Sequence, residues 1–447
     1  MKPFASIQGV AQRLLLLGAA ATVLTMLYAL GNRWGSLQDA AAWTEAALYY
    51  LLPLLAIAVI LALCALHPRI DQLFCLLMLV AGYIGLLASE IYLQNFEFDR
   101  NAKIVDAARN LGYPLDTRSK AEVVADLRRE GKDAVPFIRM ISDARLLPIG
   151  TVPGATVVTC NEFGPWLVVQ ADRHGFNNPD AVWDETEPYD AVIVGDSYTF
   201  GECDAVTGGF AAILRQQGLR VLNIGIGGNE PLLNLASIVE YASNKRARYV
   251  FWMHFAGNDL SGLMQLKAMP LPIRYVEQPD YRQNLAGRSA EIGTALRKLE
   301  DEAYPPAPAK RNFSRYITQP KFLLRSLRLY ALRSAFGLAR NTVEDTDFPL
   351  FQRSLERARD TVRTMGAELV IVNIPAVQQI GKSGDDALER ETRARVAAAG
   401  LRYLDLKPEF QKTPDYRALY AFGSGGGHFT PAGNRLTAEI LSSVVQR

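Results

Sequence analysis

A serine at the end of an apolar run is the residue best suited to nucleophilic chemistry in this sequence. Residues 191–194 are apolar and largely β-branched, and Gly195, Asp196 and Ser197 follow directly. If the run is a buried parallel strand, Ser197 lies at its carboxyl end, where open α/β sheets place their ligands. A tight turn there exposes the hydroxyl beside backbone N–H groups, as an activated serine requires. The same residues also suit an ordinary strand-to-loop turn with a capping serine.

Three further segments carry residues that could assist such a serine. Residues 223–229 are rich in glycine and include Gly228, Asn258 follows a third apolar run, and His428 precedes the last predicted helix. A glycine lets its N–H approach a reacting oxygen closely, and an asparagine amide donates without ionising. An imidazole can accept and return a proton near neutral pH. These residue types are compatible with nucleophilic chemistry at Ser197.

On these four segments the sequence resembles the SGNH (GDSL-like) hydrolase superfamily, over residues 190–446 apart from an insertion. The resemblance implies an α/β fold with a flavodoxin-like, three-layer parallel sheet. It implies acyl transfer through an acyl-Ser197 intermediate, with Ser197 as the nucleophile and His428 as the base that takes its proton. It also implies an oxyanion hole made by the N–H groups of Ser197 and Gly228 and by the side-chain amide of Asn258.

The resemblance leaves two choices open. Gly225 and Gly227 compete with Gly228, which fits the family spacing best. The family usually has an aspartate three residues before its histidine, whereas this chain has Gly425. Either a backbone carbonyl or a distant carboxylate orients His428, or the site only binds its ligand, or the catalytic partners come from elsewhere.

Asp172 and His174 are the candidates if the catalytic partners of Ser197 come from another part of the chain. They resemble the D-x-H pair that alginate acetylation enzymes of the superfamily place upstream of their serine. The competing interpretation makes His174 a structural or substrate-side loop residue, and it is preferred because His428 matches the family's last segment. Of the two other histidines, His67 falls in a membrane turn and His254 is expected to be buried inside a strand.

Alternating strands and helices must position these residues. The alternation predicts a parallel sheet with helices on both faces, interrupted by an insertion at about 260–346. The predicted strands are 191–196, 220–224, 249–255, 367–374 and 401–405. The predicted helices are 206–217, 231–245, 350–366, 386–399 and 431–446.

The first 95 residues are typical of a membrane domain. Three nearly uncharged segments approach the roughly 20 residues that a spanning helix needs. A cleaved signal peptide is the alternative for the first segment, but two more segments follow it. Lys2, Arg13 and Arg69 favour a cytoplasmic N-terminus, which predicts a multi-pass protein of the cytoplasmic (inner) membrane with its catalytic domain in the periplasm. The predicted spans are 14–32, 46–66 and 72–93.

Residues 96–189 are expected to form a connecting region before the hydrolase-like domain of residues 190–447. Ser119 and Glu122 fit a capping box that opens a helix, which Gly131 would end. On the outer side of the membrane, Cys160 and Cys203 could form a disulfide between this region and the loop after Ser197. Cys64 and Cys75 fall in predicted membrane helices and are expected to be packing residues.

A basic segment lies within the insertion. Residues 310–340 contain eight Lys or Arg residues and no acidic residue, interleaved with large apolar side chains. This pattern fits an amphipathic helix at a membrane surface, a groove for an anionic glycan or phospholipid, or a helix packed on the domain with a solvated basic face.

Composition narrows the possible partners. The 447 residues include 48 Lys or Arg and 46 Asp or Glu, a net charge of +2, so no overall field favours nucleic acid. The four cysteines form no C-x-x-C motif, and we expect neither a metal site nor a cofactor. The sequence predicts a membrane-anchored esterase or O-acyltransferase that acts on an acylated cell-envelope polysaccharide and contacts membrane lipid. The alternative is a non-catalytic envelope protein that binds a glycan in the same cleft.

Overall fold

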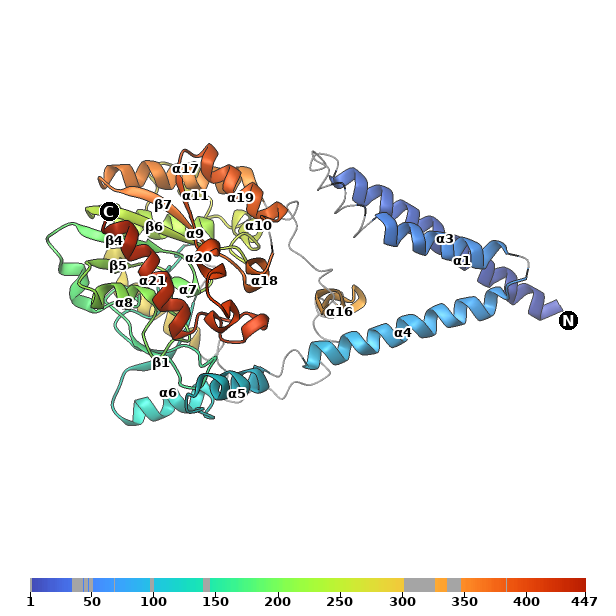
Figure 1. The fold of residues 1–447 in the computed structure, drawn as a ribbon, viewed down its shortest axis with the longest axis horizontal. Helices are drawn as coiled ribbons and strands as arrows, with labels where there is room; N and C mark the ends of the chain where they lie inside the picture. Colours follow the sequence, from blue (N-terminus) through green and yellow to red (C-terminus); the bar gives the residue numbers. More distant parts are fainter. Residues whose placement is uncertain are drawn as a thin grey trace. The chain divides into compact units, whose positions relative to one another are not determined.

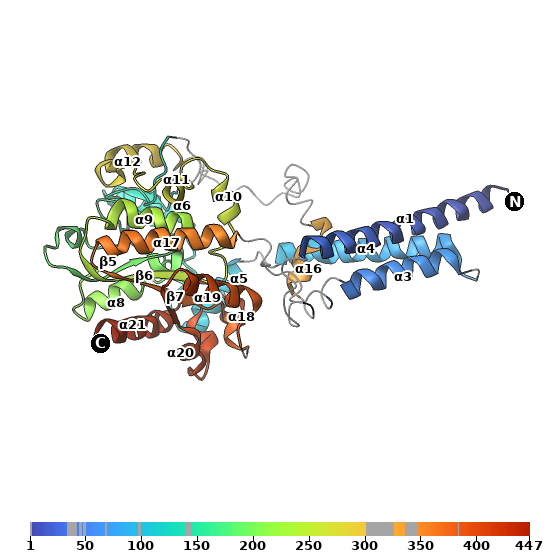
Figure 2. The same cartoon turned by 90° about the horizontal axis from the view of Figure 1, so that it is seen from above.

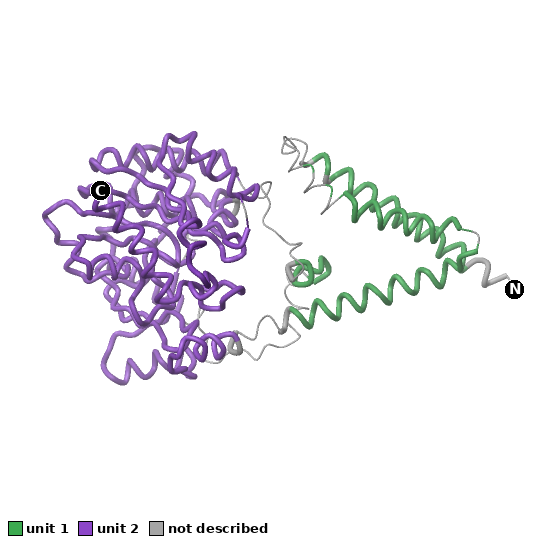
Figure 3. Tube along the Cα trace, in the orientation of Figure 1, with its two compact units in different colours: residues 1–99, 309–344 green, residues 100–308, 345–447 purple. Residues whose placement is uncertain are grey.

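The structure, a computed structural model, describes residues 2–33, 43, 47, 51–67, 69–96, 100–139, 145–300, 326–335, 347–382 and 384–447. The chain forms two compact units (Figure 3). Unit 1 comprises residues 1–99 and 309–344, and unit 2 comprises residues 100–308 and 345–447. Residues 100–189, expected as a separate connecting region, therefore belong to the same unit as the predicted hydrolase-like domain.

A five-stranded sheet forms the centre of unit 2 (Figure 1). All four strand pairings are parallel and the order is β5-β4-β6-β7-β8, which confirms the predicted α/β class. Numbered along the chain this order is 2-1-3-4-5, the doubly wound arrangement whose ligands bind beside its first strand. The strands are β4 (Tyr189–Val194), β5 (Val221–Asn223), β6 (Ala247–Phe255), β7 (Glu368–Ile374) and β8 (Arg402–Asp405).

Helices cover both faces of this sheet (Figure 2). On one face, α8 (Phe210–Gln216) and α21 (Pro431–Val445) pack on a core that includes Ile193 and Phe251. On the other face lie α9 (Pro231–Ser237), continued by a π-turn (Ile238–Ala242), and α17 (Phe348–Thr364), which α19 (Ala387–Ala398) contacts. α8 begins later than predicted because Gly208 and Gly209 both have positive φ and end the preceding turn.

The region before the sheet folds into a small layer of its own. Helix α6 (Lys120–Arg129) opens with the predicted capping box, in which Ser119 and Glu122 bond each other's backbone N–H groups. It packs on a three-stranded sheet, in which β1 (Ala134–Pro136) runs parallel to β2 (Thr156–Val158) and β3 (Val168–Gln170) runs antiparallel to β2. Helix α5 (Arg100–Leu111) precedes this layer.

Short elements complete the described part of unit 2. After β6 the chain forms α10 (Leu263–Lys267), α11 (Arg274–Glu277) and α12 (Ser289–Arg297). These helices carry part of the predicted insertion, and Arg297 forms an ion pair with Asp133 of the small layer. The remaining helices are α7 (Ser197–Phe200), α18 (Val377–Ile380) and α20 (Lys407–Gln411), with 3₁₀ turns at Asp180–Asp184, Leu285–Gly287, Tyr416–Leu419 and Gly423–Gly425.

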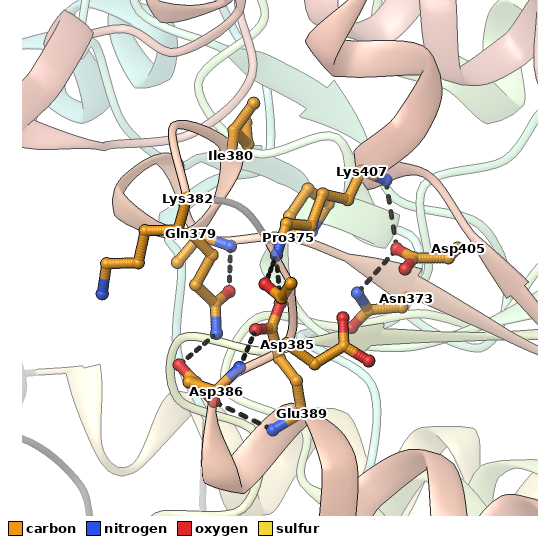
Figure 4. A network of polar contacts seen from close by, with 12 residues as sticks. Asn373, Pro375, Gln379, Ile380, Lys382, Asp385, Asp386, Glu389, Asp405 and Lys407 are labelled. Carbon is orange, nitrogen blue, oxygen red and sulfur yellow. Dashed lines mark hydrogen bonds and ion pairs between the residues drawn. The ribbon is translucent and has the colours of Figure 1, made fainter. Parts of the chain in front are cut away.

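A buried polar network joins the carboxyl ends of β7 and β8 (Figure 4). Asp405 accepts hydrogen bonds from the Asn373 amide (3.0 Å) and from the Lys407 N–H (3.1 Å). The Lys407 ammonium lies 3.3 Å from Glu389, and both side chains are about 5% exposed. The ammonium also donates to the carbonyl of Gly384, so the buried charge has two partners. The network holds the loop after β7 in place.

Unit 1 contains apolar helices that were expected from the sequence. Two of them include segments long and apolar enough to cross a membrane, residues 7–28 and residues 72–93. The second predicted span, 46–66, corresponds to a shorter apolar helix of 15 residues, and the preceding residues lie largely outside those described. The helices are α1 (Lys2–Arg33), α3 (Leu52–Leu66) and α4 (Gln72–Phe96).

A short part of the basic segment packs on α4. Residues 326–335 include α16 (Tyr330–Ala335), and the rest of the segment lies outside the described residues. The buried Glu90 carboxylate of α4 accepts hydrogen bonds from the N–H groups of Ala331 (2.8 Å) and Leu332 (2.7 Å). Tyr83 donates to the carbonyl of Leu327 (2.8 Å). A carboxylate inside an apolar helix is thus matched with donors, which its burial requires.

Candidate active site

Ser197 lies at the carboxyl end of β4, in a turn that glycine makes possible. A Cβ on Gly195 would come within 2.2 Å of the Thr199 hydroxyl and 2.8 Å of the Met253 carbonyl, so no larger residue fits there. Asp196 caps the short helix α7 by accepting the Tyr198 N–H (3.0 Å). The Ser197 hydroxyl lies 3.5 Å from an Asp196 carboxylate oxygen. The turn therefore presents Ser197 at the edge of the sheet where ligands are expected.

The glycine-rich segment after β5 lies beside this turn. The Ile226 N–H donates to the Gly195 carbonyl (3.1 Å), and the Asn223 amide donates to the Thr199 carbonyl (2.7 Å). Gly228 has a φ of +75°, which favours glycine. Among the described residues, its N–H donates to no protein atom. This N–H is therefore available to a ligand.

Asn258 lies directly after β6, next to the strand that carries Ser197. Its neighbour Asp259 is buried and accepts the Phe255 N–H (2.9 Å). Burial raises the pKa of Asp196 well above its usual value, and the nearby Asp259 carboxyl raises it further. These two buried acids link the segments of Ser197 and Asn258. The Asn258 residue itself is exposed, and within the described chain its side-chain amide has no partner.

His428 lies on a hairpin that returns to α7. Tyr420 forms an antiparallel bridge with Phe429, and the Ala421 N–H donates to the His428 carbonyl (2.9 Å). The Tyr420 hydroxyl bonds the Pro375 carbonyl (2.5 Å), so the loop after β7 supports the hairpin. The Tyr198 hydroxyl bonds the carbonyl of the preceding Gly427 (2.6 Å). His428 is thereby tied to the residue next to Ser197.

Glu162 supplies the carboxylate that the sequence near His428 lacks. Its Oε2 lies 3.0 Å from the Nδ1 of His428 and accepts the His428 backbone N–H at 2.7 Å. The Glu162 side chain is only 7% exposed. Gly425, where the family has aspartate, lies in a 3₁₀ turn and is exposed. Since Nδ1 faces the carboxylate, Nε2 is the nitrogen left to take a proton from a serine.

A disulfide secures two carboxylates at this imidazole. Cys160 and Cys203 are bonded, and the sequence had left this pairing open as one possibility. Cys160 lies two residues before Glu162, and Cys203 follows Glu202, whose carboxylate is 3.9 Å from His428 Nε2. Cys203 has a φ of +66°, a conformation that its disulfide and burial help to sustain. The Cys203 sulfur lies 3.2 Å from Nδ1.

The charges around His428 decide its protonation. Burial alone lowers the pKa of an imidazole, but the carboxylates of Glu162, Glu202 and Asp196 outweigh it and raise the pKa of His428 to about 9. Burial likewise raises the pKa of Glu202. In the free protein His428 is therefore mostly a cation at neutral pH.

The alternative pair, Asp172 and His174, is placed differently. The Asp172 carboxylate accepts bonds from the backbone N–H groups of His174 and Phe176 (both 2.9 Å) and from the side chains of Asn178 and Trp183. The His174 ring instead contacts the Ser289 hydroxyl (3.2 Å) and the edge of Trp183. Burial lowers its pKa to about 4. In the described contacts the pair does not meet Ser197, and Asp172 organises its own loop.

The remaining candidates are structural within the described chain. His254 is 2% exposed inside β6, as expected, and its Nδ1 lies 3.5 Å from Asp259. Cys160, Cys203 and His428 are a cluster of potential metal-ligating atoms among the described residues. The two sulfurs are bonded to each other, so they cannot act as thiolate ligands while the disulfide is intact.

Sequence reasoning missed Glu162 and Glu202. Neither lies in a motif, and Glu162 is 266 positions from its partner His428. One signal could have found them. A disulfide between Cys160 and Cys203, which the sequence allowed, brings the neighbours of both cysteines together, and a glutamate lies close to each one in the sequence.

Comparisons with known proteins add little to this geometry. No family model matches the chain, and no curated protein matches it. Among solved structures, one matching chain is 14% identical, and the match covers 57% of this chain and 97% of that chain with a TM-score of 0.30. At this TM-score the likeness carries no argument about fold or function.

Proposed function

We propose that this chain is a membrane-anchored serine esterase or O-acyltransferase of the SGNH type. Its catalytic residues are Ser197, His428 and Glu162, with oxyanion donors from the backbone of Ser197 and Gly228 and from Asn258. The observation that carries the proposal is the contact of the Glu162 carboxylate with His428 Nδ1. It supplies the group that orients a catalytic imidazole, which the local sequence around His428 lacks.

The reaction would proceed in two acyl transfers. Neutral His428 takes the Ser197 proton at Nε2 while the serine oxygen attacks the ester carbonyl, and the carbonyl oxygen becomes an oxyanion. The three donors stabilise that oxyanion. The loss of any one of them would lower the rate about 10²- to 10³-fold. Collapse expels the alcohol, which receives the proton from His428. Water or a sugar hydroxyl then attacks acyl-Ser197, and the same proton transfers release the acid or the new ester.

The proposal includes a location. Three membrane spans with a cytoplasmic N-terminus would place unit 2 in the periplasm, next to membrane lipid. The Cys160–Cys203 disulfide supports an oxidising compartment. Such a location favours an acylated cell-envelope polysaccharide as substrate, without a cofactor and without nucleic acid.

A second function is favoured by one contact. The hydrogen bond of the Ser197 hydroxyl is to Asp196, and no contact in the described chain joins that hydroxyl to His428. A protein that only binds a glycan in this cleft would need no serine–histidine contact. The two functions differ in whether Ser197 is chemically reactive.

The test uses the full-length protein in detergent. We expect it to release p-nitrophenol from p-nitrophenyl acetate and to be labelled by a fluorophosphonate, and we expect Ser197→Ala to abolish both. Ser443→Ala is the control, because its exposed hydroxyl bonds only the Ile440 carbonyl of its own helix in the described structure. A wild-type protein that is neither active nor labelled would favour the glycan-binding function.

A further inference from the structure

Arg139 reaches the glycine-rich segment after β5 (residues 223–229) from the small layer that precedes the sheet. It lies three residues after the end of β1, and its guanidinium spans the turn around Gly228. One terminal nitrogen donates to the Gly227 carbonyl at 2.6 Å, and the other donates to the side-chain carbonyl of Asn229 at 2.9 Å. A single planar group therefore holds the residues on both sides of Gly228.

The guanidinium also covers one face of Gly228. A Cβ built on Gly228 would clash with a terminal nitrogen of Arg139, so a larger residue there would displace the guanidinium. The Asn229 N–H closes the turn on the Ile226 carbonyl (3.1 Å). The Asn229 amide is held in turn by the Ser237 hydroxyl (3.2 Å). The orientation of the Gly228 N–H, which stays without a partner in the described chain, thus depends on Arg139.

The charge of Arg139 is retained although its guanidinium is partly buried. Burial lowers its pKa to about 10, while the carboxylates of Glu230, Glu202 and Asp196 favour the charged form. Its Nε is buried and has no hydrogen-bond partner among the described residues. An unpaired buried donor carries a desolvation cost, which the two hydrogen bonds of the terminal nitrogens offset in part. Both of these bonds are to residues that flank Gly228.

We propose that Arg139 is a positioning residue of the reaction, which fixes the Gly228 N–H toward the oxyanion and adds a positive charge near it. The inference rests on the proposed function of Ser197. Lysine cannot replace arginine here, because one ammonium cannot reproduce the two bonds of a planar fork. Neither bond is to substrate, so the effect is expected in the rate of acylation and not in substrate binding.

The test compares Arg139→Lys, Arg139→Met and Arg139→Ala with Arg118→Met, all as full-length protein in detergent. Arg118 is a half-exposed arginine of the same layer that pairs with Asp116 and Asp126. For p-nitrophenyl acetate we expect kcat of the Arg139 variants to fall about 10- to 100-fold with little change in KM. The fluorophosphonate labelling rate is expected to fall in parallel. Added guanidinium should restore part of the Arg139→Ala activity, and Arg118→Met should behave as wild type.

Each alternative result contradicts either the positioning role of Arg139 or the proposed function of Ser197. If the wild type is active and the Arg139 variants keep its kcat, Arg139 has no positioning role. A raised KM at constant kcat would make it a substrate-binding residue instead. If Arg139→Met has no cooperative thermal transition, the variant is unfolded and its activity is not informative. The role of Arg139 is then tested by Arg139→Lys and by the guanidinium rescue of Arg139→Ala. A folded Arg139→Lys protein with the kcat of the wild type would reject the inference. A wild type without activity or labelling rejects the proposed function itself, and this inference falls with it.

Discussion

The Nδ1 atom of His428 lies 3.0 Å from the Oε2 atom of Glu162, and the same oxygen accepts the His428 backbone N–H. One carboxylate thus fixes both the ring and the backbone of the histidine. The two residues come from the region before the sheet and from the last hairpin of the chain. The small layer is consequently part of the candidate active site and not a linker to it.

Glu162→Gln should reduce kcat strongly while leaving the fold intact. The amide keeps the size of the side chain but cannot stabilise the imidazolium that forms during the reaction. We expect a loss of about 10²- to 10⁴-fold with p-nitrophenyl acetate. Glu130→Gln, at an exposed glutamate of α6's C-terminal end that pairs with Lys132, is the matched control. Equal rates for both variants would contradict the role of Glu162.

The pH dependence of kcat/KM should follow the ionisation of His428. The base must be neutral, and because the surrounding carboxylates raise its pKa to about 9, only about one molecule in a hundred is competent at pH 7. Activity should therefore rise with pH, reach half of its maximum near pH 9 and level off above about pH 10. In Glu162→Gln or Glu202→Gln, loss of a negative charge lowers the pKa of His428, so the rising limb moves to lower pH. If the rising limb of the pH profile lay at the same pH in the wild type, Glu162→Gln and Glu202→Gln, His428 would not be the titrating base.

His428→Ala and His174→Ala separate the two candidate bases. We expect the first substitution to remove the esterase activity and the second to leave kcat within a few-fold of wild type. His174 packs against Trp183 and Ser289, so its loss should mainly lower the melting temperature. If only His174→Ala were inactive, the assignment of His428 would be wrong.

Loss of the Cys160–Cys203 disulfide should lower both stability and activity. The bond closes a loop across 43 positions, for which chain entropy alone gives about 4 kcal/mol. Its loss also frees the backbone next to Glu162 and Glu202. We expect Cys160→Ser/Cys203→Ser to melt earlier and to have a lower kcat. Cys64→Ser/Cys75→Ser, at the two cysteines that are free in the structure, is the control and should change kcat little.

Glu90 should hold residues 326–335 on α4. In Glu90→Ala the N–H groups of Ala331 and Leu332 lose their acceptor, so the segment should detach more often. We expect faster tryptic cleavage after Arg328 or Arg333 in detergent micelles. Ser89→Ala is the control, because that hydroxyl bonds only its own helix in the described structure. Identical cleavage rates in the two variants would argue against this contact.

Local patterns were enough to predict much of unit 2. The five strands lie within two residues of their predicted bounds, because buried β-branched runs such as 191–194 have few alternatives. The capping box at Ser119 was also readable, since its two partners are three residues apart. Helix 231–245 was predicted as one element, whereas the structure changes it to a π-turn at Ile238.

The rest of the site depends on contacts between distant segments. Glu162 and Arg139 act on His428 and on the Gly228 segment through the packing of one layer on another, which no local spacing encodes. Motif reading located the groups that would react, and tertiary packing supplied the groups that orient them.

The order in which the chain is made has a consequence for this arrangement. Arg139 and Glu162 are synthesised long before His428. A nascent chain therefore carries Ser197 and both of these residues before it carries His428. If Ser197 and His428 react as we propose, a polypeptide that stops short of the final hairpin would be inert toward esters.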